Sequence, residues 1–216
     1  TRALLIEGAG TLISLEKDDK CFAALTPLVD AAKGRFRILS QDALTFDYQS
    51  IEGPKKIVAN LPYNISTELL MGWLDQPDDI IGMTLMFQKE VAQRLVAAPD
   101  TKACGRLSLL TKARFDAEIA FILPPQVFTP APKIDSAVVT FSPTNAPLSK
   151  DQWETLKLIT RVAFAQRRKT LHNQFKAFGP LGTTMLETCG INPQRRAETL
   201  SLEEFLRLGD VYMSSK

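Results

Sequence analysis

The chain has 216 residues, which is enough for one sizeable α/β domain and a small second domain. Hydrophobic residues make up 45% and charged residues 23%, so the composition excludes disordered, fibrous and disulfide-dense proteins. The 26 basic and 24 acidic residues leave a net charge of only +2, and net charge alone therefore does not indicate nucleic-acid binding.

Cysteine usage and hydropathy indicate a protein of the reducing cytoplasm. Cys21, Cys104 and Cys189 are odd in number, far apart and without paired ligand spacing, so we expect neither a disulfide framework nor a zinc site. No apolar run approaches the roughly 20 residues that span a bilayer, and no signal-peptide pattern opens the chain. We expect a cytoplasmic monomer with no metal and no membrane partner.

Strand and helix patterns alternate through the first half of the chain. Short apolar runs predict strands at 11–16, 36–39, 56–60 and 80–87, and helical periodicity predicts helices at 18–33, 66–75 and 89–98. The alternation predicts an α/β fold with a mostly parallel, doubly wound sheet. Thr1 and Arg2 lead straight into an apolar helical run, so we expect further chain upstream.

The pattern changes from about Phe115 onward. Two strand-like runs at 118–122 and 136–141 flank a proline-rich loop, which predicts an antiparallel hairpin at the edge of the sheet. The polar, proline-punctuated segment 142–149 is typical of a linker. We therefore expect one α/β domain at 1–142 and a small all-α domain at 148–216. Trp153 to Ala163 show helical spacing, and shorter helices that break at Gly179-Pro180, Gly190 and Pro193 follow.

The most specific local pattern is Asn60-Leu61-Pro62-Tyr63, directly after a predicted buried strand. The carboxyl ends of such strands are where open α/β sheets bind ligands. An exocyclic adenine amine is a poor nucleophile, so a methylating enzyme needs acceptors for its N–H groups; the Asn60 amide and the Leu61 carbonyl could supply them. Pro62 stiffens the turn, and Tyr63 offers a face for a flipped base. The alternative is a strand-ending turn with a core tyrosine.

Two further patterns leave alternatives open. Glu16 and Asp42 each lie at the end of a predicted strand, where a carboxylate can bind a nucleoside, but a solvated charge at Glu16 and a turn-initiating Asp at 42 are equally good explanations. The stretch 155–186 holds six basic residues and no acidic one, and Arg167, Arg168 and Lys169 form its centre. These three side chains suit RNA phosphates, and a solvated helix face is the alternative.

Five motifs occur in the order found in the ribosomal RNA small-subunit adenine dimethyltransferases, and the chain resembles that family over essentially its whole length. The motifs are Asn60 to Ser66, Gln88 to Val91, Gly105 to Ser108, Phe128 to Val139 and Gln166 to Thr170. The resemblance implies a Rossmann-like methyltransferase domain and a helical RNA-binding domain. It also implies S-adenosylmethionine-dependent N6-dimethylation of two adjacent adenosines near the 3′ end of small-subunit rRNA, with the small ribosomal subunit as partner.

The resemblance implies roles for individual residues. Glu16, Asp42 and Asn60 match cofactor-binding positions, with Asp42 accepting the cofactor's adenine amine. Phe128 matches a second aromatic wall opposite Tyr63. Arg94, Arg106 and Lys133 lie in family-like motifs and are weaker RNA-binding candidates than the basic residues 167–169.

The family's glycine-rich cofactor loop ends in a Leu-Thr pair, and Thr1 resembles that Thr. We therefore expect the loop to be absent from this chain and cofactor binding to be impaired. Gly8-Ala9-Gly10 does not replace it, because this turn precedes a strand rather than following one.

Two alternatives to the small-subunit enzyme remain. The related large-subunit rRNA methylases that confer macrolide resistance share its chemistry, but Leu61 and the 166–170 motif favour the small-subunit enzyme. A non-catalytic ribosome-assembly factor could use the same RNA surface, although the intact Asn60–Tyr63 motif favours catalysis.

Overall fold

The computed structural model describes residues 1–215, which form two compact units. The first unit comprises residues 1–53 and 67–76, and the second comprises 54–66 and the chain from Pro77 onward. The predicted division at 142–148 falls within the second unit, and it stays a prediction. None of the described helices is both long and apolar enough to cross a membrane.

The first unit is built on a pair of parallel strands. Its elements are α1 (Arg2–Ile6), β1 (Leu12–Glu16), α2 (Asp19–Ala31), β2 (Phe36–Ser40), the 3-10 turn η1 (Tyr48–Ser50) and most of α3 (Ser66–Asp75). β1 pairs with β2 so that Leu12 lies opposite Phe36 and Glu16 opposite Ser40. Asp18 caps α2 by accepting hydrogen bonds from the Lys20 and Cys21 amides.

The apolar residues predicted at helical spacing pack on this strand pair. Leu5, Ala32 and Phe36 form the buried centre, and Leu25, Leu28 and Val29 of α2 pack against it. The amphipathic face of α2 therefore covers β1 and β2, as its spacing predicts.

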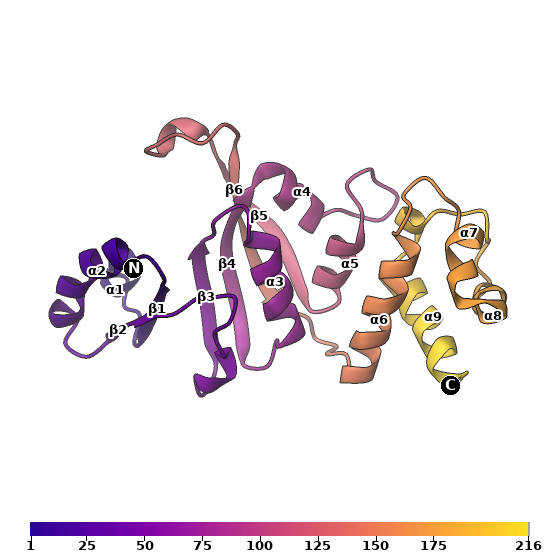
Figure 1. Ribbon diagram of the computed structural model, residues 1–216, viewed down its shortest axis with the longest axis horizontal. Helices are drawn as coiled ribbons and strands as arrows, with labels where there is room; N and C mark the ends of the chain where they lie inside the picture. Colours follow the sequence, from indigo (N-terminus) through magenta and orange to yellow (C-terminus); the bar gives the residue numbers. More distant parts are fainter. Residues whose placement is uncertain (216) are drawn as a thin grey trace. The chain divides into compact units, whose positions relative to one another are not determined.

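The second unit contains a four-stranded mixed sheet in the order β3-β4-β6-β5. Its strands are β3 (Lys55–Asn60), β4 (Ile80–Gln88), β5 (Phe115–Leu123) and β6 (Ser136–Pro143). β3 and β4 are parallel, whereas β6 pairs antiparallel with both β4 and β5. The α/β class and the antiparallel hairpin at the sheet edge are confirmed, and the segment that joins β5 to β6 projects beyond the strand ends (Figure 1).

Helices complete the second unit. These are α4 (Lys89–Leu95), α5 (Arg106–Lys112), α6 (Lys150–Ala163), α7 (Leu171–Phe175), α8 (Pro180–Thr188) and α9 (Leu202–Ser214), with 3-10 turns η2 (Pro125–Val127), η3 (Lys176–Phe178) and η4 (Ala197–Thr199). Capping boxes start α6 at Ser149 with Gln152 and α9 at Ser201 with Glu204.

Two helix predictions need correction, and one helix was missed. The helix expected at 89–98 ends at Leu95, α5 was not predicted, and α9 is a 13-residue helix rather than a short one. α5 shows no polar stripe because four consecutive residues, 108–111, are buried, so it lacks the periodicity on which a helix prediction depends.

Candidate functional site

The two carboxylates predicted to bind a nucleoside lie at the carboxyl ends of adjacent parallel strands. Glu16 ends β1, and its Oε1 accepts hydrogen bonds from the Lys17 and Asp18 amides at 2.8 and 2.9 Å. Asp42 follows β2, and its Oδ2 pairs with Lys17 Nζ at 2.7 Å. The structure thus brings these two strand ends together, as the parallel pairing predicts.

Asp42 is held as an anion. Hydrogen bonds from the Lys17 ammonium and then from the Leu44 amide hold the pKa of its carboxyl below its usual range. The carboxylate is therefore ionised at neutral pH, which suits an acceptor for an amine donor.

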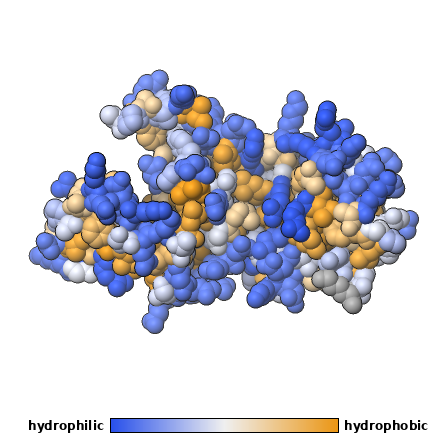
Figure 2. Space-filling view, viewed as in Figure 1, coloured by the Kyte–Doolittle hydropathy of each residue, from blue (hydrophilic) through white to orange (hydrophobic). Residues whose placement is uncertain are grey.

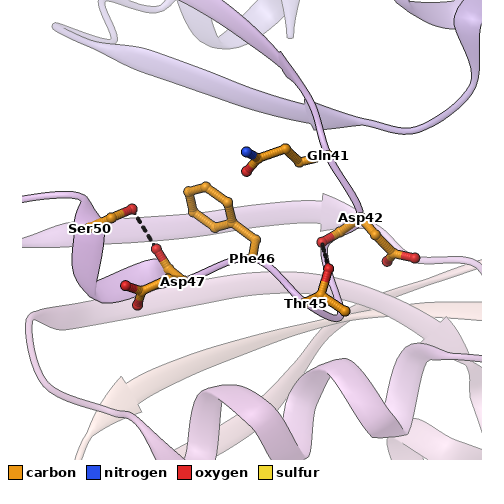
Figure 3. Close-up of a pocket in the computed structure, with 6 residues that line it drawn as sticks. All are labelled: Gln41, Asp42, Thr45, Phe46, Asp47 and Ser50. Carbon is orange, nitrogen blue, oxygen red and sulfur yellow. Dashed lines mark hydrogen bonds between the residues drawn. The ribbon is translucent and has the colours of Figure 1, made fainter.

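A pocket of about 360 Å³ opens beside the end of β2. Its lining residues are Gln41, Asp42, Thr45, Phe46, Asp47 and Ser50. Figure 3 shows the Gln41 side chain reaching over the Phe46 ring, whereas the Asp42 carboxylate points away from that ring. The pocket thus brings together an aromatic ring and an amide, with the Asp42 carboxylate directed away from them.

The turn at Gly8 to Gly10 is not a phosphate-type or cofactor loop. It follows helix α1 and precedes strand β1, the reverse of the strand-loop-helix order in which helix amides face a ligand. The Arg35 guanidinium donates to the Ala9 carbonyl at 3.0 Å and to that of Leu5 at 3.3 Å, which ties the turn to the start of β2.

The predicted catalytic turn lies at the carboxyl end of β3, in the second unit. Asn60 is the last residue of the strand and is exposed, whereas Leu61 is buried. The Ile65 amide donates to the Pro62 carbonyl at 3.1 Å, and the buried Ser66 hydroxyl donates to the Tyr63 carbonyl at 3.1 Å. These bonds hold the turn in one conformation and leave the Asn60 side chain accessible.

Tyr63 is anchored through its ring hydroxyl. Its Oη lies 2.6 Å from Oγ of Ser136, the first residue of β6. Ser136 immediately follows the loop that carries Phe128, and Asp135 beside it pairs with Lys89 through both the backbone and the side chain, at 3.0 and 2.9 Å. The two segments that carry the predicted aromatic walls are therefore joined.

The basic triplet (Arg167, Arg168 and Lys169) lies in the connection between α6 and α7 rather than on a helix face. All three side chains are exposed, and strongly hydrophilic side chains gather over this connection in Figure 2. Arg167 donates a hydrogen bond to the Lys102 carbonyl, which lies in the segment between α4 and α5. The connection is thereby fixed to the part of the unit that contains the sheet.

The remaining basic residues differ in accessibility. Arg94 is exposed and pairs with Glu90 one turn earlier on α4. Lys133 is exposed in the loop between β5 and β6. Arg106 is half-buried, and its Nε is buried without a hydrogen-bond partner among the described residues. Arg106 is thus the one of the three whose side chain is partly committed to packing.

Sequence reasoning missed several residues that shape these sites. Ser136, Lys89 and Lys102 make contacts between segments 46 to 73 residues apart, for which a single sequence carries no local pattern. Phe46 could have been found as an aromatic residue shortly after Asp42. Within residues 1–215, no group of three or more His, Cys, Asp or Glu side chains is placed to hold a metal ion.

Solved structures with the same fold include two described as a dimethyladenosine transferase and a 23S rRNA methyltransferase. A dimethyladenosine transferase from Plasmodium falciparum has a TM-score of 0.76 at 22% identity, over 92% of this chain and 80% of its own. The 23S rRNA methyltransferase ErmE has a TM-score of 0.72 at 21% identity, over 97% and 84%. These likenesses confirm the Rossmann-like methyltransferase fold.

Sequence relatives are much closer. The Ribosomal RNA small subunit methyltransferase A of Mesorhizobium japonicum is 49% identical over 96% of this chain and 77% of the relative. The protein of the same name from Brucella canis is 49% identical over 97% and 77%. The sequence model of the family described as Ribosomal RNA adenine dimethylase matches residues 1–213, and the chain therefore belongs to that family.

Proposed function

We propose that this protein dimethylates N6 of two adjacent adenosines near the 3′ end of small-subunit rRNA with S-adenosylmethionine as methyl donor. The observation that carries the proposal is the rigid Asn60–Tyr63 turn at the carboxyl end of β3, in a chain 49% identical to small-subunit methyltransferases. The reaction makes the protein an rRNA adenine N6-dimethyltransferase, with a role in maturation of the small subunit.

The mechanism requires orientation of a weak nucleophile. The Asn60 side-chain oxygen and the Leu61 carbonyl accept hydrogen bonds from the two N–H groups of the adenine amine. These hydrogen bonds direct the lone pair of the amine nitrogen away from the ring. Tyr63 and Phe128 hold the base by stacking, worth roughly 1–3 kcal/mol per face, which offsets part of the cost of unstacking it from RNA. When bound, S-adenosylmethionine would supply a methyl group on a sulfonium, so the residues of the site need to position the amine more than to transfer protons.

Cofactor binding is assigned to the first unit. Glu16 accepts from the ribose hydroxyls, and Asp42 accepts from the adenine amine beside the Phe46 pocket. We further propose that residues 1–216 alone bind the cofactor weakly. The Gly8 to Gly10 turn does not present helix amides to a ligand, and Glu16 and Asp42 are acceptors that cannot replace such N–H donors.

RNA binding is assigned to the basic triplet, with Arg94, Arg106 and Lys133 as further contacts on the predicted 1–142 domain. The exposure of the triplet supports contact with phosphates, which carry no base information and leave the choice of adenosine to the pocket. We expect the predicted 148–216 domain to bind the small ribosomal subunit. We place the enzyme in the cytoplasm, where its ribosomal substrate is made, and we expect it to be a monomer.

The alternatives are less well supported. The relatives at 49% identity are small-subunit enzymes, whereas the large-subunit methylase ErmE shares only 21% identity and the fold. A non-catalytic assembly factor would not need the Asn60 side chain exposed at the end of β3. Mapping the modified nucleotides distinguishes the two enzymes.

The test uses the protein expressed from its whole coding sequence and immature small subunits. We expect Tyr63→Ala and Phe128→Ala to lower the methylation rate by about fivefold to more than a hundredfold, with subunit binding nearly unchanged, because each removes one stacking face. Asn60→Ala should lower turnover further. Phe121→Ala, which removes an exposed phenylalanine from β5 of the same hairpin, is the matched control and should keep the parental rate. Parental rates in all three site variants would overturn the proposed site.

A further inference from the structure

Ser136 contacts the Tyr63 hydroxyl, although it has no assigned role in the reaction. It is fully buried at the first position of β6, between Gln88 of β4 and Leu123 of β5, yet it presents a hydroxyl. A buried hydroxyl without a partner is costly, so its placement depends on the group that it bonds. That group is the Tyr63 hydroxyl, at 2.6 Å.

This hydrogen bond restricts the tyrosine ring from its far end. The Ser66 hydroxyl holds the Tyr63 carbonyl at 3.1 Å, so the residue is fixed both at its backbone and at its ring hydroxyl. A ring held at both ends loses the freedom to swing about its side-chain torsions. Its face is then pre-organised, and a base that stacks on it does not have to order it first.

Ser136 also occupies the junction with the second aromatic wall. The preceding residue, Asp135, accepts hydrogen bonds from the Lys89 amide and ammonium at 3.0 and 2.9 Å, which fixes the end of the Phe128 loop to the start of α4. One short segment, 135–136, therefore contacts both the Tyr63 ring and the frame that supports the Phe128 loop.

We infer that Ser136 is a positioning residue for methyl transfer. It sets the orientation of the Tyr63 ring, on which the target base stacks. This inference rests on the proposed function and assigns Ser136 no contact with the substrate. Because the ring orientation matters once the base is bound, loss of the hydrogen bond should lower kcat more than it raises KM.

The experiment is a double-mutant cycle on the protein expressed from its whole coding sequence, with immature small subunits as substrate. Ser136→Ala and Tyr63→Phe each remove one hydroxyl of the pair, and each should lower kcat by roughly tenfold with KM within about twofold. If the two hydroxyls act only through each other, the double variant should be no slower than the slower single variant. Thr160→Val, which removes another fully buried hydroxyl from α6, is the control and should keep the parental kcat.

The outcomes separate the two proposals. Independent, multiplicative losses in the cycle, or a parental kcat in Ser136→Ala, would overturn the positioning role while the parent protein still methylates. A parent protein that methylates no small-subunit adenosine would instead overturn the proposed function. Thermal unfolding of each variant identifies a loss of fold, and the Tyr63→Phe arm keeps the test valid if Ser136→Ala unfolds, because it removes the same bond from a half-buried residue.

Discussion

Asp42 and Lys17 form an ion pair beside the pocket at the end of β2. The Lys17 side chain is mostly exposed, so the pair is screened by solvent and adds little to stability. Its consequence is chemical, because the carboxylate stays ionised. One of its oxygens accepts a hydrogen bond from Lys17, and the other accepts one from the Leu44 amide. Each carboxylate oxygen keeps a second lone pair, so Asp42 can still accept a hydrogen bond from a ligand beside these donors.

The Gly8 to Gly10 turn presents no helix amides to a ligand, so we predict weak cofactor binding by residues 1–216. In isothermal titration calorimetry with S-adenosylmethionine, we expect little heat and no saturation at micromolar concentrations of this chain. The comparison is the same titration of the protein expressed from its whole coding sequence, which should saturate. Tight binding by residues 1–216 would show that Glu16, Asp42 and the Phe46 pocket suffice, and would contradict the proposal.

At the scale of elements, local patterns predicted most of the strands and helices because each depends on neighbouring residues. α2 has both a cap at Asp18 and apolar spacing, and its observed bounds differ from the prediction by one or two residues at each end. α5 was missed because it is buried on several sides. The Tyr63–Ser136 contact could not be predicted, since it depends on β6 lying beside β4, a pairing that no local pattern specifies.

Two helix glycines should respond oppositely to the same substitution. A Cβ at Gly182 of α8 would lie 2.1 Å from the Phe175 carbonyl oxygen, so Gly182→Ala must move α8 away from α7. We expect a loss of about 1–3 kcal/mol or more in the free energy of unfolding. Gly72 of α3 has open space, so Gly72→Ala should gain about 0.5–1 kcal/mol through helix propensity. Urea titrations measure both, and parental stability of Gly182→Ala would show that the two helices are not in close contact.

At the scale of the whole molecule, the net charge is small, but positive charge is concentrated at one place. The chain is nearly neutral, but acid-free sequence surrounds the basic triplet, and the triplet is exposed between α6 and α7. Arg167 also joins this connection to Lys102. A local basic surface of this kind can bind RNA without the strong non-specific attraction of a highly charged protein, because only nearby charges act within a Debye length.

The triplet therefore predicts a specific change in salt dependence. If Arg167, Arg168 and Lys169 each contact a phosphate, replacing all three with Ala should weaken binding to immature small subunits without changing which adenosines are methylated. Each lost contact should flatten the log–log salt dependence by about 0.7 to 0.9, so the triple variant should lose roughly two to three units of slope. Titrations of parent and variant at several salt concentrations measure this change.

Two controls separate phosphate binding from structural damage. Arg168→Ala with Lys169→Ala leaves the Arg167 bond to Lys102 intact and should remove about two thirds of the effect, whereas a fold defect from loss of that bond would appear only in the triple variant. Replacing three other exposed basic residues, Lys20, Arg37 and Lys56, removes the same charge from other parts of the chain and should leave the slope nearly unchanged. Equal slopes and equal affinities for the parent and the triple variant would place the RNA-binding surface elsewhere, because a phosphate contact cannot be lost without releasing fewer counterions.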